Sequence, residues 1–320
     1  GRAMQSLLSP AILFFALGLL AALVRSNLQV PEAIGKALAI YLMAAIGLKG
    51  GVQVSQSGFT FELLLAGLAG LSLSLLLPFP VYWSVRRLGR LDRMHAGAVA
   101  AHYGSVSVVT FVTGVAALEA AGLQVAGFMV AVLALMEAPA ILVGLWLAQR
   151  TSNNQAPGLT QHMSHTLRDG SILLLVGGFL IGLVAGPGGF EPVRPVFEGA
   201  FGGILCLFLL DMGLVAARRL MESRSLTFRL GLLGVTFPVI NGTVGVLVGA
   251  MIGLDAGTTA GLGILAASAS YIAVPAAMRL ALPEADAGLY LSMSLGVTFP
   301  FNIVVGIPLF TFLAQWIISP

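Results

Sequence analysis

The sequence consists largely of apolar runs that are each long enough to cross a membrane. Hydrophobic residues make up 58% of the 320 residues and charged residues only 9%, against about 25% charged residues in an ordinary soluble domain. A soluble globule of this size cannot bury that much apolar surface, and intrinsic disorder requires the opposite composition. At about 20 residues for each membrane-spanning helix, the chain has room for roughly ten. We therefore expect an all-α polytopic membrane protein.

The apolar runs predict ten spans in two sets of five. They are Leu7–Val24, Pro31–Gly51, Phe61–Val85, Met94–Leu118, Val125–Gln149, Ser171–Gly186, Pro195–Ala217, Phe228–Gly253, Thr258–Leu280 and Ala287–Ile317. The longest polar stretch, Arg150–Asp169, is too short for a domain, so we interpret it as a linker between a first repeat (1–149) and a second (171–320). Met4 looks like the natural start, and the first span lacks a signal-peptide cleavage pattern.

The basic residues predict the orientation of the chain. Thirteen of the 16 Lys and Arg residues fall near the junctions that follow odd-numbered spans. These are Arg25, Lys36, Arg86, Arg87, Arg90, Arg93, Arg150, Arg168, Arg218, Arg219, Arg224, Arg229 and Arg279. By the positive-inside rule those junctions face the cytoplasm, and both termini lie outside it. We expect a multi-pass protein of the inner (plasma) membrane.

The two halves of the chain resemble each other in three segments that keep the same order, two of them at an offset of 161 residues and the third at an offset of 166. Residues 126–144 align with 287–306, which places Pro139 on Pro300, and residues 101–110 align with 262–271. A third match sets 32–47 against 198–213. Because each half has an odd number of spans, the halves enter the membrane from opposite sides. Such an inverted repeat is typical of secondary transporters, in which discontinuous helices form the site near the midplane.

Spans 4 and 9 occupy matching places and predict a broken-helix site. Small hydroxyl residues beside Gly or Pro suit a broken helix, whose backbone N–H groups can bind an anion. Ordinary helix packing would also use small residues, but the equivalent positions favour a site. The candidate substrate-binding residues are Gly104, Ser105, Val106 and Ser107 in span 4, and Ser268, Ala269 and Ser270 in span 9.

Glu137 lies deep in the apolar run of span 5, where an ionisable group is costly and therefore a functional candidate. It could bind Na⁺ with the oxygens of Thr298, Asn302 and Thr110, carry a proton, or be buried as a neutral acid. Thr298 occupies the position equivalent to Glu137 in span 10.

Other polar residues in the spans are weaker candidates. Asp211 could act in a gate or pair with an arginine, and Thr236 with Asn241 mark a further polar kink in span 8. His102 is the one histidine inside a predicted span, and a lone histidine is more often a hydrogen-bonded packing residue than a ligand. With one cysteine, Cys206, and no zinc, P-loop or nucleophile-elbow motif, we expect no enzyme, no cofactor, no transition metal and no ATP-driven transport. The small net charge gives no indication of nucleic-acid binding.

At these residues the chain resembles the sodium-dependent bicarbonate transporter family known from cyanobacteria. The resemblance covers nearly the whole chain, and it is best at Val30–Gly51, in the serine segment of span 4, and at Met136–Gly144, Phe208–Leu220 and Ala266–Gly296. It implies a gate or scaffold domain from spans 1, 2, 6 and 7, and a moving core from spans 3–5 and 8–10. It also implies a homotrimer, Na⁺-coupled bicarbonate uptake, and an anion site at the two broken spans.

The chain departs from the cyanobacterial pattern at two places. Tyr271 stands where that pattern has an Asp, which bears on the Na⁺ site, and the acid before the span 5 proline is Glu137 instead of Asp. The central linker is also shorter than in cyanobacterial members, whose cytoplasmic side receives a PII-like regulatory protein. Such a partner is therefore left open here.

Three hypotheses about function follow. The first is Na⁺ symport of bicarbonate by alternating access. The second is transport of another small anion or short carboxylate with Na⁺, or cation/proton antiport. The third is a membrane sensor or scaffold that binds a ligand without moving it.

Overall fold

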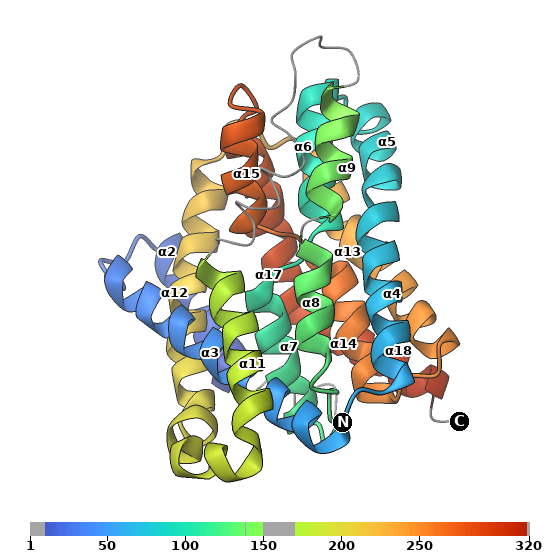
Figure 1. Ribbon diagram of the computed structural model, residues 1–320. Helices are drawn as coiled ribbons and strands as arrows, with labels where there is room; N and C mark the ends of the chain where they lie inside the picture. Colours follow the sequence, from blue (N-terminus) through green and yellow to red (C-terminus); the bar gives the residue numbers. More distant parts are fainter. Residues whose placement is uncertain (1–9, 138, 150–169, 319–320) are drawn as a thin grey trace.

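The protein is a bundle of helices of very unequal length (Figure 1). The computed structural model describes residues 10–137, 139–149 and 170–318, and no strand occurs among them. The predicted linker over 150–169 lies outside the described residues. Eight helices or helix pairs in the described part are long and apolar enough to cross a membrane, and α2 and α14 are shorter apolar helices.

The described part of the first half of the chain contains two helices, α2 and α3, followed by six further helices. Its helices are α2 (Pro10–Leu23), α3 (Glu32–Ser57), α4 (Phe61–Leu76), α5 (Pro78–Arg87), α6 (Arg93–Gly104), α7 (Val108–Ala120), α8 (Met129–Glu137) and α9 (Pro139–Gln149). The predicted third and fourth spans thus each consist of two helices in sequence, and in the fifth span residue 138, between α8 and α9, lies outside the described residues.

The second half has three long helices followed by shorter elements. Its elements are α11 (Gly170–Phe190), the short turns η1 (Glu191–Val193) and η2 (Pro195–Gly199), α12 (Phe201–Glu222), α13 (Phe228–Met251), α14 (Ala256–Ala267), α15 (Ala273–Ala281), α16 (Ala287–Leu291), η3 (Ser292–Thr298), α17 (Phe299–Phe301), η4 (Asn302–Gly306) and α18 (Ile307–Ile318). η2, η3 and η4 are π-helical, a wide form that is rare outside sites of strain or function.

Some helices begin or end at other residues than the predicted spans, because the local backbone conformation sets their ends. α3 continues past the predicted end at Gly51 to Ser57 and stops at Gly58, whose φ of 76° suits only glycine well. α12 begins at Phe201 instead of Pro195, because residues 195–199 form the π-helical turn. Apolar composition marks the membrane-embedded part of a helix but not its polar last turn.

Two glycine-mediated helix pairs form one side of the molecule, the left of Figure 1. α2 packs on α12, and α3 packs on α11. In the first pair Gly18 lies against the backbone of Leu210, and in the second Gly51 lies against the backbone of Phe179. A Cβ at either glycine would collide with main-chain atoms, so these pairs use the close backbone approach that drives helix association in lipid.

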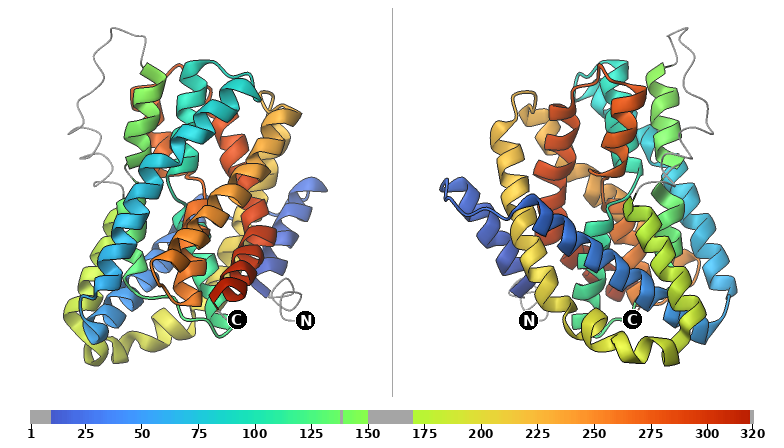
Figure 2. Two further views of the ribbon diagram at one scale, coloured as in Figure 1. Left: turned by 90° about the vertical axis from the view of Figure 1, so that its right-hand side faces the viewer. Right: turned by 60° about the vertical axis from the view of Figure 1, so that its left-hand side comes forward.

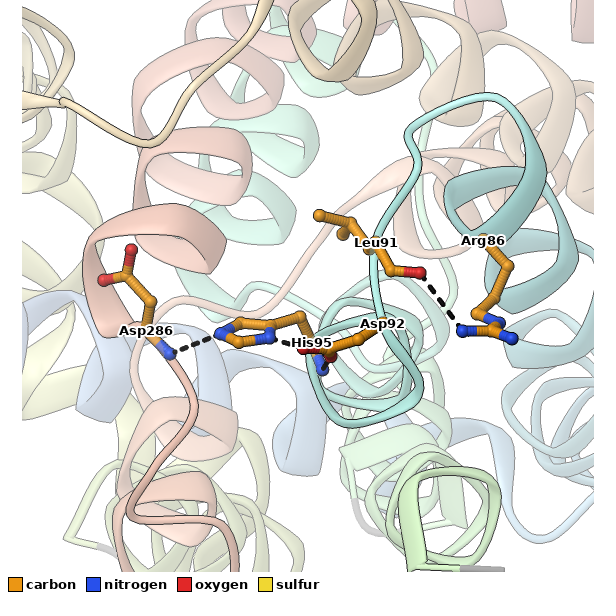
Figure 3. Close-up of polar contacts among 5 residues, drawn as sticks. All are labelled: Arg86, Leu91, Asp92, His95 and Asp286. Carbon is orange, nitrogen blue, oxygen red and sulfur yellow. Dashed lines mark hydrogen bonds and ion pairs between the residues drawn. The ribbon is translucent and has the colours of Figure 1, made fainter.

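The Arg-rich connections lie at one end of the molecule. Figure 2 shows the α5–α6 and α12–α13 connections at the end opposite the C-terminus of α18. His95 joins two connections there, as Figure 3 shows: its Nδ1 lies 2.8 Å from Asp92 Oδ1, and its Nε2 accepts the backbone N–H of Asp286 at 3.2 Å. Because Nε2 is the acceptor, Nδ1 carries the proton and donates it to Asp92.

Candidate functional site

Span 4 is broken where the sequence predicts a break. α6 ends at Gly104 and α7 begins at Val108, with three non-helical residues between them. Ser107 is the N-cap of α7, and its hydroxyl oxygen accepts the N–H of Thr110 at 3.1 Å. The cap holds the first turn of α7 in place and leaves the N–H groups of Val108 and Val109 at the open end of the helix.

Span 9 has a corresponding break. α14 ends at Ala267 and α15 begins at Ala273, and the Ser270 hydroxyl accepts the N–H of Val274 at 3.2 Å. The two breaks touch each other. Ser107 N–H donates to Ser268 Oγ at 3.0 Å, and Ser270 N–H donates to the carbonyl of His102 at 2.9 Å.

A small buried cavity lies where the two breaks meet. Its lining residues are Val106, Ser107, Val108, Glu137, Ser270, Tyr271, Ile272 and Ala273. Val108 and Ala273 are the first residues of α7 and α15, so the N-termini of both half-helices border the cavity. The free space is close to that of a single water molecule. Among the described residues, the cavity is therefore bordered by two partial positive charges and by no lysine or arginine, which suits a small ion.

Glu137 supplies the only carboxylate that the described residues place on this cavity. It is 3% exposed, and the Ser105 hydroxyl lies 3.0 Å from its carbonyl oxygen and 3.4 Å from its Oε2. Pro139, at the start of α9, has no N–H to donate, so the helical hydrogen bonding is interrupted close to Glu137.

Ser74 of α4 stabilises that interruption. Its hydroxyl donates to the carbonyl of Met136 at 2.8 Å and accepts the N–H of Ala140 at 3.2 Å. An unbroken helix would join these two groups directly, so the hydroxyl is inserted into the helical ladder. Ser74 thereby fixes the backbone that carries Glu137.

Thr298, the predicted sodium ligand in span 10, binds the backbone of α13 instead of reaching the cavity. Its hydroxyl donates to the carbonyl of Gly234 at 2.6 Å. In a regular helix the carbonyl of Gly234 would accept the N–H of residue 238, but that residue is Pro238, which has no N–H. Since Thr298 uses its proton there, the Tyr103 hydroxyl at 2.5 Å must be the donor to Thr298 Oγ1.

The other two predicted sodium ligands also have protein partners. Asn302 donates from Nδ2 to the carbonyl of Ala267, the last residue of α14, at 2.9 Å, while its buried Oδ1 has no hydrogen-bond partner among the described residues. Thr110 donates from Oγ1 to Ser107 Oγ at 3.0 Å. Glu137 is therefore the one member of the predicted sodium set that lines the cavity.

The predicted substrate residues divide into lining and supporting positions. Val106, Ser107 and Ser270 line the cavity. Ser268 ties the breaks together, and it also donates to the carbonyl of Leu265 at 2.8 Å, so both hydroxyl functions are occupied. The remaining three lie behind the cavity: Ser105 on Glu137, Ala269 buried in the core, and Gly104 against Pro78 and Ala140.

The weaker candidates lie away from the cavity. His102 is fully buried, with Nδ1 2.6 Å from the carbonyl of Ala98 and its ring stacked on Tyr290 at 4.5 Å. Asp211 of α12 faces Gly35 of α3. Thr236 bonds the carbonyl of Leu232 in its own helix, and Asn241 is buried on the same helix.

Ile272 is a cavity residue that the sequence reasoning missed. It is 45% exposed, and besides the cavity it borders a groove of about 1110 Å³ that runs along α3 and α11. Its position directly after Tyr271, inside the predicted break, was the available signal. The Ile272 side chain separates the cavity from the groove.

The comparisons with known proteins gave one match, to a family of transporters. A family model described as the Na⁺-dependent bicarbonate transporter superfamily matches residues 10–315. A comparison with curated proteins found no match. A transporter superfamily is not an enzyme class, and with the apolar helices it indicates a multi-pass membrane protein.

Proposed function

The chain belongs to the Na⁺-dependent bicarbonate transporter superfamily, and we propose that it takes up bicarbonate together with Na⁺ by alternating access. The observation that carries this proposal is the meeting of two half-helix N-termini at one buried cavity that also contains Glu137. Broken helices that meet in this way form the substrate sites of many secondary transporters.

The anion would bind at the two helix N-termini. Ser107 and Ser270 add hydroxyl groups, and the first N–H groups of α7 are oriented by the Ser107 cap. These groups can replace part of the hydration shell of a small anion without a fixed positive side chain. The limited free space favours an ion of few atoms over a larger substrate.

The cation would bind at Glu137. A carboxylate and an anion in one cavity repel each other strongly when little water screens them. Na⁺ at Glu137 removes that repulsion, and carboxylate oxygens are suitable ligands for a hard cation. Each ion then favours the binding of the other, as linkage requires. Thr298 Oγ1 is engaged with Gly234 and Tyr103, and neither Thr298 nor Asn302 lines the cavity, so we assign the main ligand role to Glu137.

The helix packing supports the inverted repeat. The pairing of α2 with α12 becomes the pairing of α11 with α3 when the two halves are exchanged. In the same way, α5 on α6 corresponds to α13 on α14, and α6 on α9 corresponds to α14 on α18. A pseudo-two-fold relation between five-span halves would produce this set of pairs.

We propose that the α2, α3, α11 and α12 group acts as the gate or scaffold and that the remaining helices form the moving core. The Arg-rich end would face the cytoplasm, with both termini outside it. The groove along α3 and α11 borders both groups through Ile272, which makes it a suitable path to the site. A homotrimer and a PII-like partner stay predictions.

The decisive experiment is uptake of radiolabelled bicarbonate into proteoliposomes. An inward Na⁺ gradient is compared with an equal K⁺ gradient, and protein-free liposomes measure the leak of CO₂. Glu137→Gln, which keeps the shape of the side chain, and Ser72→Ala, an exposed serine on α4, are reconstituted in parallel.

Accumulation that requires Na⁺ and is lost in Glu137→Gln but kept in Ser72→Ala would support the proposal. Accumulation that does not require Na⁺ would rule out the hypothesis of Na⁺ symport. Absence of accumulation by correctly folded protein would overturn bicarbonate transport, and uptake of radiolabelled formate or acetate would then test other small anions.

A further inference from the structure

Tyr271 lines the cavity, and its hydroxyl group is buried. Tyr271 is 8% exposed, and its ring packs edge-on against Phe299 with 5.3 Å between centroids. The hydroxyl lies next to the Ser107 side chain, but it makes no hydrogen bond of ordinary geometry to any described residue. A buried hydroxyl without a partner is costly, so such a group calls for a ligand.

The neighbouring groups are also donors. The Ser107 oxygen already accepts two hydrogen bonds, from the N–H and the hydroxyl of Thr110, which leaves its own proton available. The N–H groups of Val108 and Val109, at the open end of α7, donate to no described residue. The Tyr271 hydroxyl and the N-terminus of α7 therefore present several unused donors to one small space.

The cavity has more hydrogen-bond donors than acceptors. The one carboxylate on the cavity, Glu137, is already approached by the Ser105 hydroxyl. An incoming anion with oxygen atoms would supply acceptors for the hydroxyl of Tyr271 and for the first turn of α7 together. A charged acceptor makes such hydrogen bonds about twice as strong as those between neutral groups.

We propose that Tyr271 donates its phenolic hydrogen directly to the transported anion and selects small oxyanions over halides. The inference rests on the proposed function, because it concerns the same cavity. The rigid ring fixes the direction of the donor, and an oxyanion can accept from Tyr271 and from α7 with different oxygen atoms. A halide offers the same charge but no separate oxygen acceptors. Ile272 at the mouth excludes anions with bulky substituents.

Tyr271→Phe tests the proposal because it keeps the ring on Phe299 and removes only the hydroxyl. At saturating Na⁺, the KM for bicarbonate is expected to rise about tenfold to a hundredfold, the usual cost of losing a hydrogen bond to a charged group. At saturating bicarbonate, the Na⁺ concentration for half-maximal uptake should stay within about twofold of the parent value, since an anion ligand alone is lost. Tyr82→Phe, which removes a hydroxyl from a buried tyrosine of α5 outside the cavity, is the matched control and should leave both constants unchanged.

A binding measurement separates failure of this inference from failure of the proposed function. Purified protein is heated in detergent with bicarbonate, formate or chloride, and the rise in Tm reports binding without transport. We expect stabilisation by the two oxyanions in the parent and in Tyr82→Phe, little stabilisation by chloride, and loss of the oxyanion effect in Tyr271→Phe. Tyr271→His, which keeps an aromatic ring with a donor, should recover part of the effect.

The results distinguish the possible partners of Tyr271. Parent-like KM and Tm shifts in Tyr271→Phe would overturn the proposal. A change in Na⁺ activation with unchanged bicarbonate KM would also overturn it, because it would place the hydroxyl on Glu137. If the parent does not transport bicarbonate but the oxyanions stabilise it through Tyr271, the proposed function fails while the anion contact stands.

Discussion

The backbone N–H of Ser107 donates a hydrogen bond to the hydroxyl of Ser268, the residue that aligns with Ser107 in the internal repeat. The two halves of the chain are thus tied at equivalent positions in their breaks. The two serines differ in how much hydrogen-bonding capacity their hydroxyl groups have left. Ser268 uses its hydroxyl both as acceptor and as donor, whereas Ser107 keeps its hydroxyl proton and borders the cavity.

This asymmetry predicts different effects for two serine substitutions. Ser268→Ala leaves the buried Ser107 N–H without an acceptor, which should cost about 1–3 kcal/mol of stability, so Tm in detergent should fall. Ser107→Ala removes a cavity hydroxyl, so the KM for the anion should rise, although loss of the α7 cap will also reduce stability by about 1 kcal/mol. Thermal unfolding and initial uptake rates measure the two effects.

Ser72→Ala is the control for both variants, since Ser72 lies on the exposed face of α4 and bonds only within its own helix. If Ser268→Ala raised KM while Tm stayed at the parent value, Ser268 would be a ligand and the assignment of a supporting role would be wrong.

A second prediction concerns Thr298 and Pro238. Thr298→Val keeps the shape of the side chain but removes the donor to the Gly234 carbonyl and the acceptor for Tyr103. We expect a loss of about 1–3 kcal/mol in stability. Pro238→Ala restores an N–H that can reach the Gly234 carbonyl within the helix, so it should be less harmful in the Thr298→Val background than alone. Thermal unfolding of the four proteins of this double-mutant cycle measures the coupling.

Thr311→Val is the matched control, because Thr311 of α18 bonds only the carbonyl of Ile307 one turn earlier. A reduced apparent affinity for Na⁺ in Thr298→Val, with additive effects in the cycle, would contradict the structural role and favour a sodium ligand.

A third prediction concerns acid stability at the Arg-rich end (Figure 3). The Ser225 hydroxyl, which donates to Asp286 Oδ2, and the Gly288 N–H lower the pKa of Asp286, although burial opposes them. Burial raises the pKa of Asp92, but the hydrogen bonds from His95 outweigh it and the pKa is lowered. A carboxyl group whose pKa is lower when folded stabilises the protein above its unfolded value of about 4, and this contribution is lost as the pH falls through the folded pKa.

Tm should therefore fall as the pH is lowered below about 4. Asp286→Asn should have a lower Tm at pH 7 and a smaller further decrease in acid, whereas Glu284→Gln, at an exposed position in the same connection, should follow the parent. Equal acid sensitivity of Asp286→Asn and the parent would show that this carboxyl does not contribute to the pH dependence.

The sequence was sufficient to find both helix breaks because each depends on local chemistry. Gly104 and the serines that follow it, like Ser268 and the residues up to Pro275, favour an interrupted helix over a continuous one. The matching position in the other half strengthened each prediction. Glu137 could be found for a similar reason, since a lone acid in an apolar run needs a function or a partner.

The roles of supporting side chains could not be predicted, because their partners are distant in sequence. Ser74 lies 62 residues from Met136, and Thr298 lies 64 residues from Gly234. Only the packed structure shows that Pro139 and Pro238 create backbone gaps that these hydroxyls fill. The hydroxyl-rich motif around Thr298 therefore suggested a sodium ligand, where the structure has a backbone partner.

The final prediction uses an ion pair between the proposed gate and the proposed core. Lys49 of α3 lies 3.2 Å from Glu119 Oε2 of α7, and both side chains are mostly buried. If the core moves past the gate during transport, this pair must separate in each cycle. Joining the two positions covalently should therefore stop uptake.

The experiment replaces Lys49 and Glu119 by cysteine in a Cys206→Ser background and joins them with a short, reducible thiol cross-linker in proteoliposomes. Uptake should fall to the leak rate after cross-linking and recover after dithiothreitol, because reduction frees α3 from α7. Each single-cysteine variant, treated identically, should retain its uptake, which excludes simple thiol modification as the cause. Parent-like uptake by the cross-linked protein would mean that α3 and α7 stay together throughout the cycle, and the boundary between gate and core would then have to be drawn elsewhere.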